Sequence, residues 1–319
     1  MPPVRIDALQ YCNWSGDVFE EMRRGGLDAV HVTIAYHEGF RETVDRITAW
    51  HRLFREHSGL IRPARTSADI RAAREEGRTA VLFGAQNPQV IENDIGLVEV
   101  LHQLGLSFMQ LTYNNQSLLG SGWQEAEDTG LGRMGHEVLA EMNRLGMVAD
   151  LSHAGERTTL DAIAASARPV AVTHANPRTA RDTGRNVTDR MIDALAGSGG
   201  MLGLSLYPHH LPGGSDCTLE AFCQMAARTA ERIGPGQLGI GSDLCQGQPD
   251  NVVEWMRTGR WTHARSGATF PEQPAWFKSN SDWDRISEGL IRIGFSDAET
   301  AGILGENWLG WLDSALRPA

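Results

Sequence analysis

Two short apolar runs that each end in a histidine decide the fold: Met147-Val-Ala-Asp-Leu-Ser-His153 and Pro169-Val-Ala-Val-Thr-His174. The segment between them, residues 156–167, is predicted to be one helix. A strand, a helix and a second strand in this order form the unit from which parallel sheets are built. Because parallel strands end at the same edge of a sheet, we expect the two imidazoles side by side. Adjacent neutral imidazoles are good ligands for a divalent metal ion.

The same alternation recurs along the chain. Apolar runs rich in Val, Ile and Leu, typical of strands covered on both faces, alternate with segments of helical spacing and capping. Eight such units predict an α/β fold, a (β/α)8 TIM barrel, with a doubly wound open sheet as the alternative. The eight strand runs are residues 4–10, 29–35, 79–84, 107–112, 147–152, 169–173, 201–206 and 238–242, and the clearest helical segments are 67–77, 133–145, 188–196 and 219–233.

The tail after Asp243 is less regular than the rest. No low-complexity stretch or internal repeat marks a linker, so residues 1–319 are expected to form one domain, in which the tail is a long eighth loop followed by a packing helix near 297–316. The tryptophan-rich segment 255–283 is expected either to cap the barrel mouth or to form the contact of a homodimer. Its tryptophans are Trp255, Trp261, Trp276 and Trp283.

The composition is that of an ordinary globular protein, with 319 residues, 41% of them hydrophobic, and a formal net charge of −11. This acidic balance argues against nucleic acid and anionic membranes as partners, because no basic cluster offsets it. No apolar run approaches the ~20 residues that span a bilayer, and neither end shows a signal core or an anchor. Four cysteines without a CxxC pair make no disulfide framework. We therefore expect a cytoplasmic protein.

Polar side chains follow the predicted strands, at the end of a barrel where chemistry gathers. The stretch Gly239-Ile-Gly-Ser-Asp243 would bring a carboxylate close to His153 and His174. Two imidazoles and one carboxylate can hold a divalent ion and leave positions open for water, whose pKa then falls to about 7. Taken singly, each residue also has a purely structural explanation: a histidine can hydrogen-bond its neighbours, and Asp243 can cap the next segment.

Other residues near the strand ends suit substrate binding. Arg185 follows the second histidine and can clamp a carboxylate with two hydrogen bonds, although Arg185 or Asn186 can equally serve to fix its loop. Asn114 opens a run of uncharged donors and acceptors suited to orienting an amide or hydroxyl group. Supporting or substrate-contacting positions are expected for His37, His209 and His210, and buried inert thiols for Cys12 and Cys245.

Several stretches, in order along most of the chain, together resemble the renal or membrane dipeptidase family, which are metal-dependent hydrolases on amidohydrolase-type barrels. The resemblance implies that His153 and His174 bind one metal, that Arg185 binds the substrate carboxylate, and that Asp243 handles the proton of the attacking water. The stretches are residues 135–153, Val172-Thr-His174, Arg185-Asn-Val-Thr-Asp189, Gly239-Ile-Gly-Ser-Asp243 and Leu304-Gly-Glu-Asn-Trp308.

The chain departs from the family pattern at the second metal. The family has a His-x-Asp pair on strand one, where this chain reads Asp7-Ala-Leu-Gln-Tyr11. Leu9 and Tyr11 would then replace the pair, or Gln10 and Cys12 after a shift of one residue, and both registers stay open.

Two further family residues also differ here. Gln86 stands for the bridging Glu and Tyr113 for the strand-four His that supports the tetrahedral intermediate. Without those anions, two divalent ions side by side would be strongly unfavourable in a low-dielectric site. We therefore expect one metal ion, zinc, with Gln86 able to offer its carbonyl oxygen to the ion and Tyr113 able to hydrogen-bond an oxyanion.

Three hypotheses follow for the function. The first is a hydrolase with a single metal ion that cleaves an amide bond in a dipeptide, an N-acyl amino acid or a related small carboxylated substrate, with Asp243 as general base. The second is a degenerate, non-catalytic relative that keeps the pocket and binds a small molecule. The third is a lyase or isomerase that uses the same metal on another small molecule.

Overall fold

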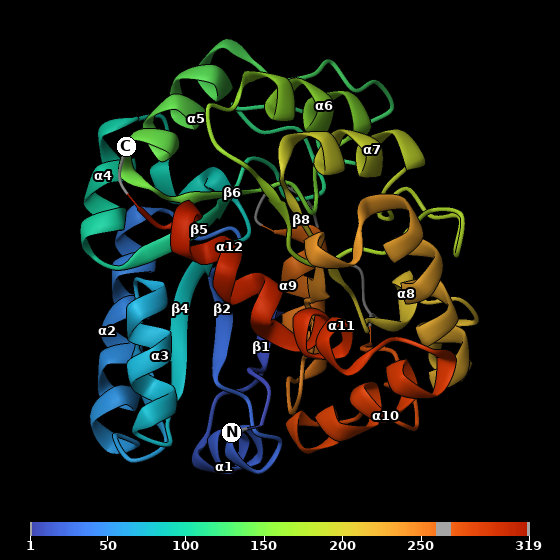
Figure 1. Cartoon of the computed structure of the whole chain (residues 1–319). Coiled ribbons are helices and arrows are strands. Elements are labelled where there is room, and N and C mark those ends of the chain that lie inside the picture. Colours follow the sequence, from blue (N-terminus) through green and yellow to red (C-terminus); the bar gives the residue numbers. More distant parts are fainter. Residues whose placement is uncertain (1, 260–268, 318–319) are drawn as a thin grey trace.

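The computed structural model describes residues 2–259 and 269–317, and its centre is a closed barrel of eight parallel strands (Figure 1). β1 pairs with both β2 and β9, and β2 pairs with β4, which closes the ring. The predicted TIM barrel is therefore confirmed. The barrel strands are β1 (Ile6–Gln10), β2 (Ala29–Ala35), β4 (Thr79–Ala85), β5 (Leu106–Gln110), β6 (Val148–Asp150), β7 (Ala171–Val172), β8 (Met201–Leu204) and β9 (Leu238–Ile240).

A short extra strand, β3 (Ile61–Pro63), pairs with the first residues of β4 and was not predicted. Helices surround the barrel, and the predicted segments lie within one or two residues of the observed ones. At α3, for example, the hydroxyl of Thr66 accepts from the backbone of Asp69, and α5 ends at Gly146 with a φ of 75°. The helices are α1 (Gly16–Arg24), α2 (Phe40–Glu56), α3 (Ser67–Glu75), α4 (Gly96–Gln103), α5 (Arg133–Leu145), α6 (Glu156–Ala165), α7 (Asp189–Ser198) and α8 (Leu219–Ile233).

The tail contains α9 (Asp250–Thr258), α10 (Trp283–Ile293), α11 (Asp297–Ala301) and α12 (Asn307–Ala315). α12 crosses the amino-terminal end of the barrel, in the foreground of Figure 1, where the Trp308 indole donates to the Ile240 carbonyl at 3.2 Å. Gly239 permits this approach, because a Cβ there would lie 2.1 Å from the indole nitrogen. Trp283 is fully buried in the hydrophobic core, and Trp261 lies outside the described residues.

The half of the barrel nearer the amino-terminal ends of the strands is filled with packed side chains. Its interior contains small and apolar side chains from every second strand position, with Trp308 closing the end. The His31 ring fits among them, stacked on Phe108 at 4.1 Å in the space that Gly84 leaves. Because this half of the barrel is filled, open space remains only toward the carboxyl ends of the strands.

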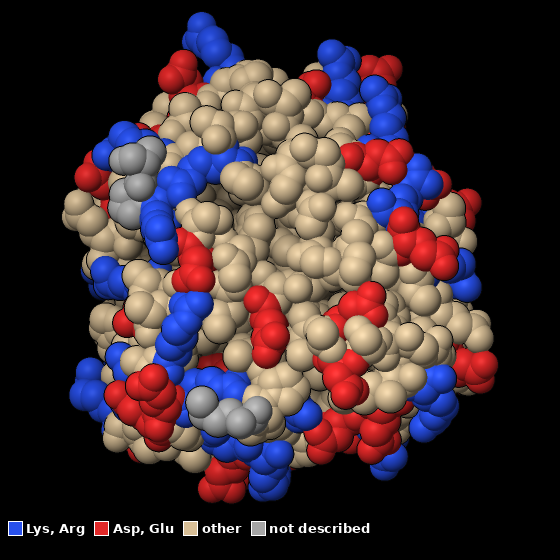
Figure 2. All heavy atoms as spheres, in the orientation of Figure 1, with Lys and Arg blue, Asp and Glu red and all other residues tan. Residues whose placement is uncertain are grey.

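The outer surface carries charges of both signs. Figure 2, which has the orientation of Figure 1, shows basic and acidic side chains mixed around a largely uncharged centre, with no basic patch on this face. Among residues 2–259 and 269–317, no helix is long and apolar enough to cross a bilayer.

Candidate active site

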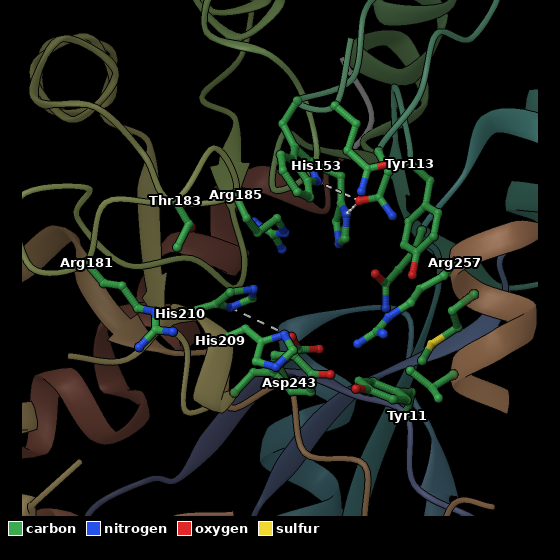
Figure 3. Close-up of a pocket in the computed structure, with 17 residues that line it drawn as sticks. Tyr11, Tyr113, His153, Arg181, Thr183, Arg185, His209, His210, Asp243 and Arg257 are labelled. Atoms are coloured by element: carbon green, nitrogen blue, oxygen red, sulfur yellow. Dashed lines mark hydrogen bonds and ion pairs between the residues drawn. The ribbon is translucent and has the colours of Figure 1, made fainter. Parts of the chain in front are cut away.

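A cavity of about 530 Å³ opens at the carboxyl ends of the strands (Figure 3). His153, Arg185 and Asp243 line it together with Tyr113, Asn114 and Gln86, so the barrel brings six of the predicted catalytic, substrate-binding and metal-binding residues to one place. His174 lies directly beneath His153, fully buried, with the two ring centroids 5.2 Å apart. The predicted convergence of the strand ends is thus observed.

The hydrogen bonds of His153 define which ring nitrogen carries its proton. The Trp123 indole donates to the side chain of Asn114 at 2.7 Å, and an indole N–H can only donate. The Asn114 atom at that position is therefore the oxygen. His153 Nδ1 lies 2.7 Å from the same oxygen, so it is the protonated nitrogen and His153 Nε2 keeps a lone pair.

Hydrogen bonds also define which ring nitrogen of His174 carries its proton. Its Nδ1 lies 2.7 Å from the Thr173 hydroxyl, which donates to the buried Asp150 carboxylate at 2.6 Å. A hydroxyl that donates to a carboxylate accepts from the imidazole, so His174 Nδ1 is protonated and Nε2 is free. Asp150 is itself held by the Gln110 amide at 2.9 Å and by the Thr173 backbone N–H.

The two free Nε2 atoms lie 3.1 Å apart with no proton between them. Burial, and then the positive charge of Arg185, hold the pKa of each imidazole well below its ordinary value, so both rings are neutral. Two lone pairs at this distance repel each other unless a cation lies between them. Nitrogens that share a tetrahedral zinc ion lie about 3.3 Å apart, close to the observed separation.

The other atoms near the pair offer few anionic ligands. Among the described residues, no group of three His, Cys, Asp or Glu side chains is arranged to hold a metal ion. Gln86 lines the cavity and is nearly buried, and its amide nitrogen donates to Thr33 Oγ1 at 2.8 Å. The two Nε2 atoms therefore fit a shared divalent ion, and no group of three His, Cys, Asp or Glu side chains in residues 2–259 and 269–317 is arranged to hold another.

Arg185 points into the cavity and donates through Nη2 to the His174 carbonyl at 2.9 Å. Its Nε and Nη1 are buried without a hydrogen-bond partner, and burial lowers its pKa to about 10. The neighbouring Asn186 fixes the loop instead, because its amide donates to the carbonyls of Arg181 and His210, each at 3.0 Å. Arg185 was expected either to bind a substrate carboxylate or to fix its loop. Since Asn186 fixes the loop, the guanidinium of Arg185 is available for a ligand.

Asp243 lies across the cavity from Arg185 in a left-handed backbone conformation with a φ of 59°. The residue before it, Ser242, is held by Asp7, which accepts from its backbone N–H at 2.7 Å and from its hydroxyl at 2.5 Å. Burial raises the pKa of Asp243 to about 7, and the charge of Arg185 opposes that rise. His210 Nδ1 lies 4.0 Å from the carboxylate.

The structure settles the register of β1. Tyr11 lines the cavity and Leu9 packs in the same buried cluster, whereas Gln10 points away and donates to Asp7 and Asn280, both at 2.7 Å. The Cys12 thiol also points away, with the Leu244 carbonyl 3.4 Å from its sulfur. The places that the family resemblance assigns to a second metal are therefore occupied by an aliphatic side chain and a phenol.

All four tyrosines of the sequence pack in one cluster at the cavity. Burial raises the pKa of each phenol, so each keeps its proton. The Tyr113 ring packs against His153 with the ring centroids 4.4 Å apart and the planes tilted by 30°. Its three companions are Tyr11, Tyr36 and Tyr207.

The remaining candidates differ in their positions. His209 and His210 line the cavity, but His37 packs behind it, 5.5 Å from the Tyr113 ring. Asn114 lines the cavity, although its oxygen already accepts from two donors. Sequence reasoning missed Trp123 and Arg257, which also line the cavity, and no local pattern marks either of them.

Comparison with known proteins places this site in a family. A family model described as membrane dipeptidase (peptidase family M19) matches residues 16–315. Dipeptidase verJ of Clonostachys rogersoniana is 31% identical over 215 residues, which are 67% of this chain and 55% of that protein. Dipeptidase tcpJ of Claviceps purpurea is 30% identical over 70% of this chain and 52% of its own. The chain spans about half the length of these curated relatives.

Solved structures agree with this assignment. An amidohydrolase from Pseudomonas aeruginosa is 34% identical with a TM-score of 0.94, covering 98% of this chain and 96% of its own. A metallopeptidase from Rhodobacter sphaeroides, solved with a phosphinate mimic of L-Ala-D-Ala, is 18% identical with a TM-score of 0.82, over 99% of this chain and 100% of its own, and shows the same fold. The chain therefore belongs to the membrane dipeptidase family of hydrolases, peptidase family M19.

Proposed function

We propose that this protein hydrolyses an amide bond in a dipeptide or a related small carboxylated substrate, with a single divalent metal ion at His153 and His174. The observation that carries the proposal is the pair of Nε2 lone pairs that face each other at 3.1 Å beside the unpartnered donors of Arg185. Membership of a metallopeptidase family supports the same chemistry.

The metal is proposed to be zinc, because neutral imidazoles suit it, with the Gln86 carbonyl oxygen as a further donor. A divalent ion there would polarise a substrate carbonyl and lower the pKa of a bound water. One ion is proposed rather than two, because Leu9, Tyr11 and Gln86 supply no negative charge to offset a second.

The side chains of the chain itself have distinct proposed roles. Arg185 binds the substrate carboxylate through the guanidinium N–H groups that have no acceptor among the described residues of the protein. Asp243 accepts the proton of the attacking water, for which a pKa of about 7 suits a general base near neutral pH. Tyr113, which keeps its proton, donates to the oxyanion that develops on the carbonyl.

A non-catalytic, ligand-binding barrel is the second candidate. The observation that favours it is the loss of anionic groups near the ends of β1 and β4, where Tyr11 and Gln86 line the cavity and Leu9 packs in the cluster beside it. Under this alternative the buried Arg185 would still bind a carboxylate, but no bond would be cleaved.

Metal analysis and turnover together test the proposal. The purified protein, loaded with zinc, manganese or iron and dialysed, should retain about one ion per chain by elemental analysis. His174→Asn should abolish retention, whereas His136→Asn, at an exposed position on α5, should not. Retention of no ion under any loading condition would refute the metal site.

A panel of dipeptides and N-acyl amino acids then separates the two candidates. Turnover that Asp243→Asn abolishes while metal content stays unchanged supports the hydrolase. Binding of the same compounds without any turnover, across all metals, supports the non-catalytic barrel.

A further inference from the structure

The charges of the cavity differ in sign from those of the protein as a whole. The chain carries a net charge of −11, yet the cavity is lined by three arginines, Arg181, Arg185 and Arg257, and by one carboxylate, Asp243. Three positive charges less one negative charge leave an excess of two. The histidines do not change this sum, because burial lowers the pKa of His153, His209 and His210.

The arginines lie on different sides of the cavity. Figure 3 shows Arg181 and Arg185 on one side and Arg257, from α9, reaching in from the opposite side. Arg185 is deep and buried, whereas Arg257 is exposed at the mouth. Arg257 and Tyr207 both line the cavity, so their side chains border the same space.

Arg181 and Arg257 have no acidic partner among the described residues. Other arginines of this half of the barrel pair with acids: Arg190 with Glu156 at 3.6 Å, and Arg232 with Asp189 at 2.7 Å. No ion pair joins Arg181 or Arg257 to any carboxylate in residues 2–259 and 269–317. Within the described part of the chain, the Arg181 side chain donates only to the Leu211 carbonyl, at 3.1 Å, and no carboxylate there compensates its charge.

We propose that the substrate carries two acidic groups: an α-carboxylate bound by Arg185, and a side-chain carboxylate bound at the mouth by Arg257 and the Tyr207 hydroxyl. The substrate class is a dipeptide or N-acyl amino acid that contains aspartate or glutamate. Two carboxylates offset the two excess charges, and Arg181 adds to the attraction without direct contact. This inference rests on the proposed function for its chemistry.

A cavity of about 530 Å³ accommodates such a ligand, since sites for small molecules begin at roughly 300 Å³. The separation of the two arginines also defines an orientation, because a ligand that reaches both must lie across the cavity, past His153 and Asp243. The amide bond of the substrate would then lie beside the groups assigned to its cleavage.

Matched substrates that differ only in charge test the inference. The pairs are Ala-Glu with Ala-Gln, and Glu-Ala with Gln-Ala. For at least one pair, kcat/KM of the acidic member should exceed that of its amide by about tenfold, the size of a charge-assisted hydrogen bond. Arg257→Gln should reduce this ratio to near one, mainly through KM, and Arg257→Lys should retain part of it. Arg190→Gln, an exposed arginine outside the cavity, should leave the ratio unchanged.

Binding provides a readout that does not depend on turnover. N-acetylglutamate should bind about tenfold more tightly than N-acetylglutamine by titration calorimetry, and Arg257→Gln should remove that difference. Equal rates within both substrate pairs, together with equal affinities for the two ligands, would overturn the inference and leave the proposed hydrolase intact. Absence of turnover with a retained difference in affinity would overturn the hydrolase and leave the second acidic position intact.

Discussion

The Thr173 hydroxyl is the most informative single group to remove, because it connects the His174 imidazole to the Asp150 carboxylate through contacts of 2.7 Å and 2.6 Å. Thr173→Val keeps the shape of the side chain and deletes these two hydrogen bonds, together with a longer one to the Ser152 hydroxyl at 3.2 Å. Asp150 retains donors from Gln110, from Ser152 and from the backbone N–H of residue 173. The loss of stability therefore comes mainly from the buried Nδ1–H of His174, which no longer has a hydrogen-bond acceptor.

An unpaired buried donor costs about 1–3 kcal/mol, so the free energy of unfolding should fall by that amount in urea titrations of the metal-free protein. Loss of an imidazole's orienting partner typically weakens metal binding by about 10–100-fold, and a chelator-competition titration with zinc should show a change of this size. The matched control is Thr229→Val on α8, whose hydroxyl donates to the Met225 carbonyl far from the cavity.

Thr229→Val should lower stability modestly and leave zinc affinity unchanged. The reasoning is refuted if Thr173→Val binds zinc as tightly as the unaltered protein. In that case His174 would not depend on the Thr173 hydroxyl for its tautomer, and the assignment of two facing lone pairs would fail.

Three further predictions concern Arg185, Asp243 and Gly239. Arg185→Lys should raise KM about tenfold or more for carboxylated substrates, because an ammonium cannot bind both oxygens in parallel, and steady-state kinetics against C-terminally amidated analogues would show no such rise. Because the folded pKa of Asp243 is about 7, above its ordinary value near 4, the folded state binds the proton more tightly, so its contribution to stability is full at low pH and declines between pH 4 and 7. Asp243→Asn should therefore stabilise the metal-free protein at pH 8 more than at pH 4 in urea titrations, and an equal effect at both values would contradict this. Gly239→Ala should lower stability by about 1–3 kcal/mol because its Cβ would collide with Trp308, whereas Gly310→Ala, with open space around it, should be neutral or stabilising in thermal melts.

The sequence was sufficient for the architecture because buried parallel strands and capped helices leave local signals. All eight barrel strands were predicted, and so was the convergence of His153, His174, Arg185 and Asp243, since the barrel topology requires strand ends to meet. The strand β3 was missed because three residues that end in a proline carry too little apolar pattern to distinguish a strand from a turn.

The finer features of the site depended on tertiary structure. The inward face of β1 could not be predicted, because a strand buried on both sides shows no alternation that separates Tyr11 from Gln10. Trp123, which fixes the His153 tautomer through Asn114, lies in a loop without a regular pattern. Arg257 reaches the cavity only because α9 folds back over the mouth, and the tail sequence carries no sign of that path.

The concentration of every tyrosine at the cavity has a practical consequence. Fluorotyrosine incorporated during expression would yield four fluorine resonances, all from residues that line or adjoin the proposed site. Because no tyrosine lies elsewhere in the chain, the fluorine spectrum would carry no background from the remainder of the molecule. Ligand occupancy and phenol ionisation could then be followed directly in a protein of this size, without chromogenic substrates or assignment by mutagenesis of distant positions.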